Sequence, residues 1–221
     1  MMNDDEKEIV TKTQEMNEFD IKASGWDANP VHLQRSVAIA QMLTEMVPLT
    51  KDTRALELGA GTGLLSLLLK DRLKSVTMID SSQEMIRIID KKIAEQGITN
   101  MTTLVLDLEK EDMNGNYDIV YSQMVFHHVG DIDKILCKFY NLLEPGGYLG
   151  IADLFKEDGS FHDEHFTGHN GFEPDELMKM LKRNHFDDIR YQSCFVIKKT
   201  SENGSVREYP VFLMTARKAD S

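Results

Sequence analysis

Cysteine and long apolar runs are scarce in this chain of 221 residues. The only two cysteines, Cys137 and Cys194, both lie in apolar sequence. Two thiols cannot build a disulfide framework or a thiolate metal site, and this favours a reducing, intracellular compartment. No apolar run approaches the roughly 20 residues that a membrane-spanning helix needs. The first ten residues, MMNDDEKEIV, are acidic and lack the apolar centre of a secretory signal. These absences predict a cytoplasmic protein that does not cross a membrane.

Positive charge is also in short supply. The chain has 25 lysines and arginines against 37 aspartates and glutamates, a formal net charge of −12, and no basic run interrupts this excess. So acidic a surface repels phosphate backbones and anionic lipid, and we therefore expect neither nucleic acid nor a membrane as partner. Hydrophobic residues still make up 41% of the chain, enough for a sizeable core. The length favours one domain over residues 1–221.

Apolar segments alternate with helical patterns from residue 54 onward. Such alternation implies right-handed crossovers and a parallel sheet, and therefore an α/β fold. Ser81 followed by Glu84 predicts a capping box at the start of one helix. The dipeptide Asn203-Gly204 predicts a terminal hairpin between the last two strands. The predicted strands are 54–58, 75–80, 102–107, 117–122, 148–153, 191–199 and 207–217, and the predicted helices are 31–47, 63–73, 83–96, 131–143 and 174–185.

Two segments lie outside this alternation. Residues 1–47 precede the first strand, and we expect them to form an N-terminal helical cap. Residues 154–172 are rich in His, Asp, Glu, Phe and Gly without a clear period. Long connections of this kind often carry function, so we expect residues 154–172 to cover an acceptor pocket together with the cap.

A glycine-rich turn follows the strand 54–58 and carries Gly59, Gly61 and Gly63. Glycine permits unusual backbone angles and leaves room for a ligand, and free N–H groups at the following helix start attract oxygen atoms. A dinucleotide site would read G-x-G-x-x-G around a pyrophosphate. Here the spacing is G-x-G-x-G, and Glu57 at the turn would repel pyrophosphate but suit an ammonium or sulfonium group. A nicotinamide-dependent oxidoreductase is therefore the less favoured alternative.

Acidic residues also end the next two strands. Asp80 follows Gly59 by 21 residues, where a carboxylate accepts hydrogen bonds from both ribose hydroxyls. Asp107 is suited to an adenine edge, with Leu108 packing on the ring. Taken singly, Asp80 could be a helix N-terminal acid and Asp107 a solvated strand end. Together with Glu57 they line one crevice at the carboxyl edge of the sheet.

Five motifs spread over nearly the whole chain resemble the class I S-adenosylmethionine-dependent methyltransferases. They are ALELGAGTG, MIDSSQEM, LVLDLE, YDIVYSQMVFHHV and LLEPGGYLGIAD, in the order that the family has them. The resemblance implies a Rossmann-like, doubly wound sheet of seven strands, mostly parallel with the last strand antiparallel, and helices on both faces. It also implies S-adenosylmethionine as cofactor. By the same resemblance the cofactor site is lined by Glu57, Gly59, Gly61, Gly63, Asp80, Ser81, Met85, Asp107, Leu108 and Ser122.

Three further segments narrow the resemblance. FDIKASGWD near residue 19, FHHV near 126 and GHNGFEPDEL near 168 are similar to small-molecule methyltransferases of quinone biosynthesis and their relatives. Enzymes that methylate amide or exocyclic amino nitrogens carry an Asn/Asp-Pro-Pro-aromatic signature, where this chain reads Ser122-Gln123-Met124-Val125. We therefore expect a small-molecule acceptor, with the oligomeric state left open between monomer and homodimer.

His127 and His128 are the candidate catalytic residues. They follow the fourth strand beside the crevice, and a neutral imidazole has a suitable pKa for a general base. Either ring could instead serve only in packing, because in-line methyl transfer depends mainly on positioning of the acceptor. A non-catalytic, S-adenosylmethionine-binding regulatory module remains the alternative function.

Other side chains complete the predicted site. Trp26 could shield a sulfonium by cation–π attraction or could be plain core. His169 and Phe172 are expected nearest the acceptor. His162 and His165 lack the helical i, i+4 spacing of a metal pair, so no metal site is predicted.

Overall fold

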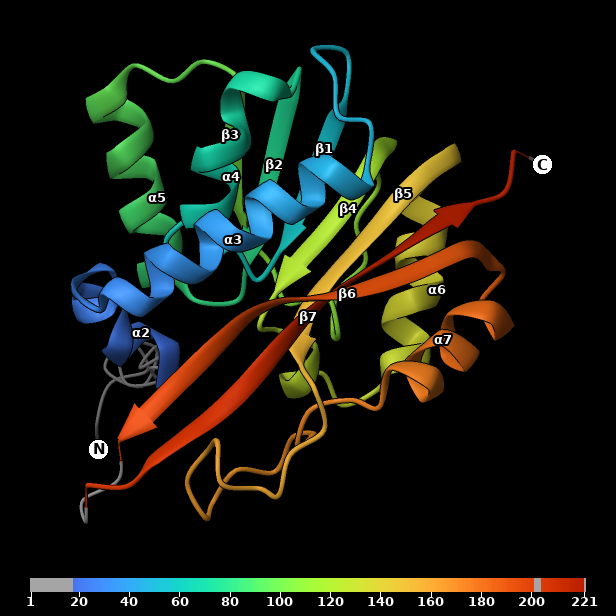
Figure 1. Cartoon of the computed structure of the whole chain (residues 1–221). Helices are drawn as coiled ribbons and strands as arrows, with labels where there is room; N and C mark the ends of the chain where they lie inside the picture. Colours follow the sequence, from blue (N-terminus) through green and yellow to red (C-terminus); the bar gives the residue numbers. More distant parts are fainter. Residues whose placement is uncertain (1–17, 201–203, 221) are drawn as a thin grey trace, which may run out of the picture.

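Seven strands form one sheet in the computed structural model, which describes residues 18–200 and 204–220. Their order is β3-β2-β1-β4-β5-β7-β6 (Figure 1). Neighbours from β3 to β5 pair in parallel, whereas β7 runs antiparallel between β5 and β6. The predicted sheet, with its last strand antiparallel, is confirmed. The strands are β1 Arg54–Leu58, β2 Ser75–Asp80, β3 Met101–Val105, β4 Tyr117–Gln123, β5 Leu143–Leu154, β6 Phe186–Thr200 and β7 Val206–Lys218.

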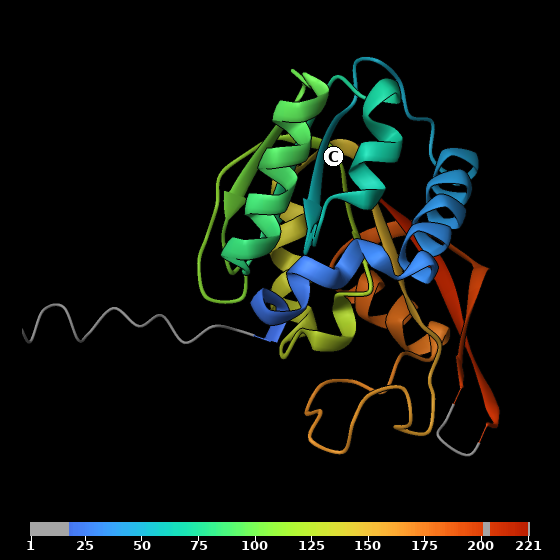
Figure 2. The ribbon, with the colours of Figure 1, turned by 90° about the vertical axis from the view of Figure 1, so that its left-hand side faces the viewer.

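Helices cover both faces of the sheet because successive strand residues point to opposite sides. In β1, Ala55 packs in one core cluster with residues of α3, α4 and α5, while Leu56 packs in the other with residues of α6 and α7. Figure 2 shows α3, α4 and α5 as separate rods. The helices are α2 Glu18–Lys22, α3 Pro30–Met46, α4 Leu64–Leu69, α5 Gln83–Gln96, α6 Ile132–Leu142 and α7 Pro174–Arg183, with short 3-10 turns η1 Ala23–Ala28, η2 Lys70–Arg72 and η3 Phe126–His128.

Polar caps set where the long helices begin. The Asn29 side chain accepts a hydrogen bond from Val31 N at 3.0 Å, one residue before Pro30 opens α3. Asp131 caps α6 by accepting from Lys134 N at 3.0 Å. Because Asn and Asp side chains satisfy N–H groups that the first turn leaves unpaired, they stabilise these helix starts.

The capping box predicted at Ser81 is wrong by one residue. Ser82 is the cap of α5, and its Oγ accepts from Met85 N at 3.1 Å. The backbone N–H of Ser82 donates to Asp80 Oδ1 at 2.8 Å, which places Ser82 at the non-helical cap position. Ser81 is thereby left exposed at the mouth of the site.

Several predicted boundaries also shift. The helix predicted over 63–73 ends at Leu69 and continues as η2, and the strand predicted over 102–107 ends at Val105. The strand predicted over 148–153 begins earlier, at Leu143, because Leu143 pairs with Tyr117 of β4 before an irregularity in the register, and pairing resumes at Tyr148. Asn203 lies outside the described residues, and Thr200 pairs with Val206 across the predicted turn.

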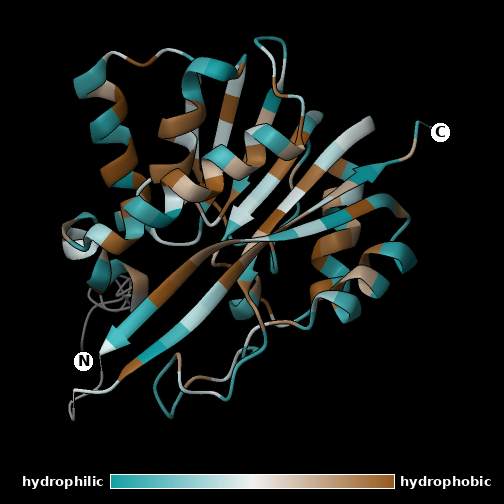
Figure 3. Ribbon diagram, in the orientation of Figure 1, coloured by the Kyte–Doolittle hydropathy of each residue, from teal (hydrophilic) through white to brown (hydrophobic). Residues whose placement is uncertain are grey.

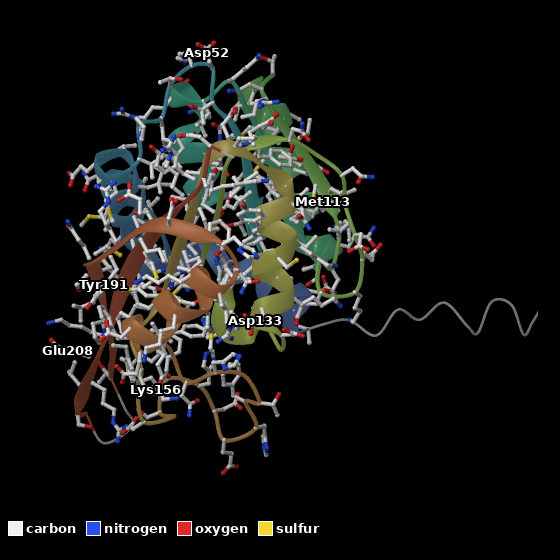
Figure 4. All side chains as sticks on the ribbon, turned by 90° about the vertical axis from the view of Figure 1, so that its right-hand side faces the viewer. Asp52, Met113, Asp133, Lys156, Tyr191 and Glu208 are labelled. Atoms are coloured by element: carbon white, nitrogen blue, oxygen red, sulfur yellow. The ribbon has the colours of Figure 1, made fainter. Side chains whose placement is uncertain are left out.

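The surface of the molecule carries charged side chains on its outer strand and helices. Figure 3 shows β6 changing from hydrophobic to hydrophilic toward its end, where Lys198 and Lys199 lie. Arg183 of α7 forms an ion pair with Asp133 of α6, which is labelled in Figure 4. Among the described residues, no helix combines the length and apolar character needed to cross a bilayer.

Candidate functional site

A cavity of about 690 Å³ lies at the carboxyl ends of the parallel strands. The cap elements α2 and η1 and the connection after β5 gather at this end of the molecule (Figure 1). A volume of this size suits a cofactor together with a small second ligand. The predicted site residues that line the cavity are Trp26, Gly59, Gly61, Asp80, Ser81, Met85, Asp107, Leu108, His127 and His128.

The glycine turn brings bare backbone to the cavity wall. Gly59 and Gly61 adopt positive φ of 63° and 56°, a region that disfavours other residues. A Cβ at Gly59 would collide with the Val125 side chain. A Cβ at Gly61 would lie 4.0 Å from Trp26 Nε1, between the turn and the cap. Without side chains, this turn leaves a cradle for an extended ligand below Trp26.

Asp80 closes the other side of the glycine turn. Its Oδ2 accepts from Gly61 N at 2.8 Å, and its Oδ1 accepts from Ser82 N at 2.8 Å. Burial raises the pKa of Asp80, and these backbone N–H groups oppose that rise. Each carboxylate oxygen has two lone pairs, so Asp80 keeps acceptor capacity for hydroxyl groups of a ligand in the cavity.

Asp107 and Leu108 form the far end of the cavity, just beyond β3. Asp107 Oδ1 accepts from Glu109 N at 3.1 Å, and Oδ2 pairs with Lys110 at 2.8 Å. Partial burial alone would raise the pKa of Asp107, but Lys110 and the backbone N–H groups hold this pKa below its usual value. Leu108 is buried beside it and offers an apolar surface.

Glu57 lies beneath the glycine turn instead of on the cavity wall. Its carboxyl group is fully buried and accepts a hydrogen bond from the Ser66 hydroxyl, while Oε1 has no partner among the described residues. Burial raises the pKa of Glu57 to about 8. Glu57 therefore does not line the cavity, and the direct contact with a cationic ligand that the sequence suggested does not fit this geometry.

Four other predicted site residues also do not line the cavity. Gly63 caps α4, where a Cβ would press on Ile89 at 3.2 Å. Ser122 is buried at the end of β4. His169 donates its backbone N–H to His127 O at 2.7 Å and bonds Val129 O through Nε2 at 3.0 Å, so it fastens the connection to η3. Phe172 is buried in the core.

The sequence did not reveal a buried pair in which one partner, His127, lines the cavity. His127 Nδ1 lies 2.6 Å from Asp153 Oδ1, and both side chains are buried. A carboxylate only accepts, so Nδ1 donates to it, and in the neutral imidazole Nε2 then has the lone pair. Asp153 Oδ1 also accepts from Leu154 N at 2.7 Å, which fixes the carboxylate. One sequence feature could have indicated this pair. Asp153 lies near the end of β5, and β5 pairs with β4, the strand that precedes His127.

Three histidines meet beside this pair. The ring centroid of His127 lies 4.3 Å from that of His128 and 5.0 Å from that of His162. The ring centroids of His128 and His162 are 5.4 Å apart, and one ring nitrogen from each of the three lies within 4.8 Å of the others. His165, by contrast, is exposed over 88% of its side chain. His162 therefore lies beside His127 and His128, whereas His165 does not.

A buried cation, Arg35 of α3, also lines the cavity. Arg35 is 6% exposed, and its Nε has no hydrogen-bond partner among the described residues. Burial lowers the pKa of Arg35 to about 10, and nearby Asp153 opposes that change. The sequence pattern did not reveal Arg35, because an arginine in an amphipathic helix is typical of an ordinary surface position.

Cap residues hold the roof of the cavity. Trp26 packs against His32, with ring centroids 4.3 Å apart. Asp27 accepts from Thr62 Oγ1 at 2.6 Å and pairs with Lys92 at 2.6 Å. Asp20 accepts from Ser82 Oγ at 2.6 Å. The cap is therefore tied to the segments that follow both β1 and β2. Residues 1–17 of the predicted cap lie outside the described residues.

Known proteins share this sequence pattern. Residues 55–147 match the family model described as a methyltransferase domain. An uncharacterized methyltransferase of Schizosaccharomyces pombe, C1347.09, is 31% identical over 144 residues, covering 58% of this chain and 51% of that protein. The ubiquinone biosynthesis O-methyltransferase of Xanthomonas axonopodis pv. citri is 29% identical over 142 residues, covering 62% and 58%. This chain thus spans little more than half the length of these two relatives.

Solved structures share the fold. The YcgJ protein of Bacillus subtilis superimposes with a TM-score of 0.67 at 15% identity, over 83% of this chain and 99% of that one. Phosphoethanolamine N-methyltransferase 2 of Haemonchus contortus, solved in complex with S-adenosylmethionine, gives a TM-score of 0.67 at 18% identity, over 84% and 52%. Together with the family match, this confirms the resemblance that the motifs carried. Over residues 55–147 the chain therefore carries a methyltransferase domain.

Proposed function

We propose that the protein transfers a methyl group from S-adenosylmethionine to a small-molecule acceptor. The observation that carries this proposal is one cavity that joins the Gly59–Gly61 turn and Asp80 to the His127–Asp153 pair. When bound, the cofactor supplies a methyl group bonded to a sulfonium sulfur. The thioether released when that bond breaks is a good leaving group. The bare backbone at Gly61 and the acceptor oxygens of Asp80 fit such a cofactor.

Each part of the cofactor has a matching part of the cavity. Asp80 would accept hydrogen bonds from the ribose hydroxyls, and Asp107 with Leu108 would hold the adenine. Gly59 and Gly61 would hold the methionine portion, under the ring of Trp26. A tryptophan face attracts a cation, so Trp26 would also favour the sulfonium.

The acceptor side is formed by His127, His128, Phe161 and His162. Holding an acceptor on the line through the reacting bond contributes roughly 7–11 kcal/mol to such a reaction. Where the acceptor must lose a proton, His127 Nε2 would take it, because Asp153 fixes the ring with that lone pair available. A positioned base of this kind contributes about 10²–10⁴-fold in rate.

Two features support a small acceptor. The chain is acidic at −12, and one relative is named for ubiquinone biosynthesis. Charge and scarce cysteine also favour a cytoplasmic enzyme that does not act on nucleic acid.

Calorimetric titration with S-adenosylmethionine tests the cofactor site. We expect binding by the wild type, and a loss of about 10–100-fold in affinity for Asp80→Ala, because hydrogen bonds to a charged group contribute roughly 1.5–3 kcal/mol. Asp71→Ala, at a side chain that is 86% exposed, is the matched control and should bind as the wild type does. NADH should give no heat. Equal affinity of the wild type and a folded Asp80→Ala variant would refute the cofactor site.

A screen of phenol, quinol, thiol and amine acceptors tests turnover. For an acceptor that must lose a proton, we expect His127→Ala to lower kcat by about 10²–10⁴-fold with little change in KM or cofactor affinity. His165→Ala, at an exposed site, is the control. Cofactor binding without turnover on any acceptor would instead support a regulatory module.

A further inference from the structure

We infer that His127, His128 and His162 form a binding site for a divalent transition-metal cation such as Zn²⁺ at the acceptor end of the cavity. The three side chains come from η3 and from the connection after β5, and all three line the cavity. Cation binding itself does not depend on the proposed methyl transfer. Only the role of the cation in catalysis rests on that proposed function.

The spacing of the rings is close to what a cation needs. One ring nitrogen from each histidine lies within 4.8 Å of the other two. With Zn–N distances of about 2.0–2.1 Å, tetrahedral geometry requires nitrogens about 3.4 Å apart. Small side-chain rotations would close this difference. His162 stacks on Phe166 with centroids 3.7 Å apart, so the ring already has a defined orientation beside the other two.

A buried carboxylate already holds one of the three ligands. Asp153 accepts from His127 Nδ1 at 2.6 Å, so the Nε2 lone pair is the one available for a cation. Metal-bound histidines usually donate their other N–H to such a carboxylate, which fixes the ring and raises its basicity.

The ligand type selects the class of cation. Three imidazole nitrogens suit Zn²⁺ and its transition-metal neighbours, whereas Mg²⁺ and Ca²⁺ prefer oxygen ligands. Three protein ligands leave the fourth position of a tetrahedral site open, which is the arrangement of catalytic sites, whereas structural sites are closed by four protein ligands. Because all three histidines line the cavity, a ligand in the cavity would be able to take the open position.

At that position the cation would bind the acceptor hydroxyl or thiol and lower its pKa. The proton leaves to solvent, the acceptor lone pair forms the new bond to the methyl carbon, and the carbon–sulfur bond breaks with its electron pair remaining on sulfur. His127 Nε2 cannot both ligate the cation and take the acceptor proton. Proton transfer to His127 therefore belongs to the cation-free protein.

Tag-free protein, stripped with a chelator and studied without cofactor or acceptor, tests the site directly. We expect calorimetry to give one Zn²⁺ per chain and Co²⁺ to give the visible absorption of a tetrahedral site. His162→Ala should weaken Zn²⁺ binding by at least about tenfold, and Asp153→Asn by about 10–100-fold. His165→Ala, on the same connection but exposed, should bind Zn²⁺ as the wild type does.

Absence of Zn²⁺ binding by the wild type, or equal losses in His162→Ala and His165→Ala, would overturn the inference. Titration with S-adenosylmethionine and thermal unfolding report the fold of each variant, and His162→Gln replaces His162→Ala if the latter does not fold. A protein that binds S-adenosylmethionine but no Zn²⁺ overturns only the cation site. A protein that binds Zn²⁺ but no S-adenosylmethionine overturns only the proposed function.

Discussion

At the scale of single residues, two buried carboxyl groups at strand ends have different surroundings. Asp153 accepts from the Leu154 N–H and from the ring N–H of His127. Glu57 accepts from the Ser66 hydroxyl through Oε2, and its Oε1 has no partner among the described residues. Because hydrogen bonds replace lost hydration, Glu57 is poorly compensated as an anion, and its pKa rises to about 8. The glycine turn therefore rests on a carboxyl group that is protonated at neutral pH.

The raised pKa of Glu57 predicts a pH-dependent stability. Between about pH 4.5 and pH 8 the native state holds a proton that the unfolded state has lost, so this group lowers the free energy of unfolding as pH rises. The slope is at most about 1.4 kcal/mol per pH unit. Glu57→Gln, which mimics the protonated form, should remove this contribution. Urea unfolding of both proteins at about pH 5, 6, 7 and 8 should show the wild type losing stability relative to the variant. A difference that does not change with pH would contradict the assignment.

At the scale of elements, the turn between β1 and α4 depends on glycine for two separate reasons. Gly59 has φ of 63°, and its Cα faces the Val125 side chain that follows β4. Gly97, which ends α5, has nearly the same φ of 61°, but a Cβ there would have no atom within 4 Å. The two glycines therefore share the backbone strain and differ in the close contact.

Alanine at the two glycines separates these effects. Both Gly59→Ala and Gly97→Ala should lose about 1–2 kcal/mol from the left-handed backbone. Gly59→Ala should lose further stability from the clash with Val125, and it should also weaken S-adenosylmethionine binding. Thermal unfolding and calorimetry measure both. Equal losses of stability, with unchanged cofactor affinity in Gly59→Ala, would show that the turn is not packed as described.

At the scale of the whole molecule, the cap joins parts of the chain that are distant in sequence. Asp27 of η1 bonds Thr62 at 2.6 Å and Lys92 of α5 at 2.6 Å, so it links the cap to the segment after Gly61 and to a helix. This link holds the segment of Trp26, which lines the cavity, against the rest of the molecule. A segment that covers bound ligands excludes water from the reacting groups and must loosen for the product to leave.

Weakening this link should speed product release. Asp27→Ala removes a partly exposed ion pair and a hydrogen bond, together worth about 1 kcal/mol, which corresponds to roughly fivefold in the dissociation rate of S-adenosylhomocysteine. Stopped-flow displacement measures this rate. Asp52→Ala, at the end of the molecule away from the cap (Figure 4), is the control. Equal rates in Asp27→Ala and the wild type would mean that the cap does not gate the cavity.

Local patterns along the chain determined much of this protein. The alternation of strands and helices, the glycine turn and the acidic ends of β2 and β3 were predictable, because spacing and turn chemistry act between residues close in sequence. The carboxyl ends of parallel strands meet at one edge, so Asp80 and Asp107 could also be assigned to one cavity in advance.

Tertiary structure alone decided which side chains meet around His127. Asp153 meets His127 across 26 residues because β5 lies beside β4, and His162 in place of His165 joins that pair because of the path of an irregular connection. Alternate residues of β1 face opposite sides of the sheet, and the glycine turn lies above Glu57. For these two reasons the Glu57 side chain does not reach the cavity. Contacts of this kind depend on strand order and loop path, which no local pattern encodes, and they are the contacts that place the reactive groups.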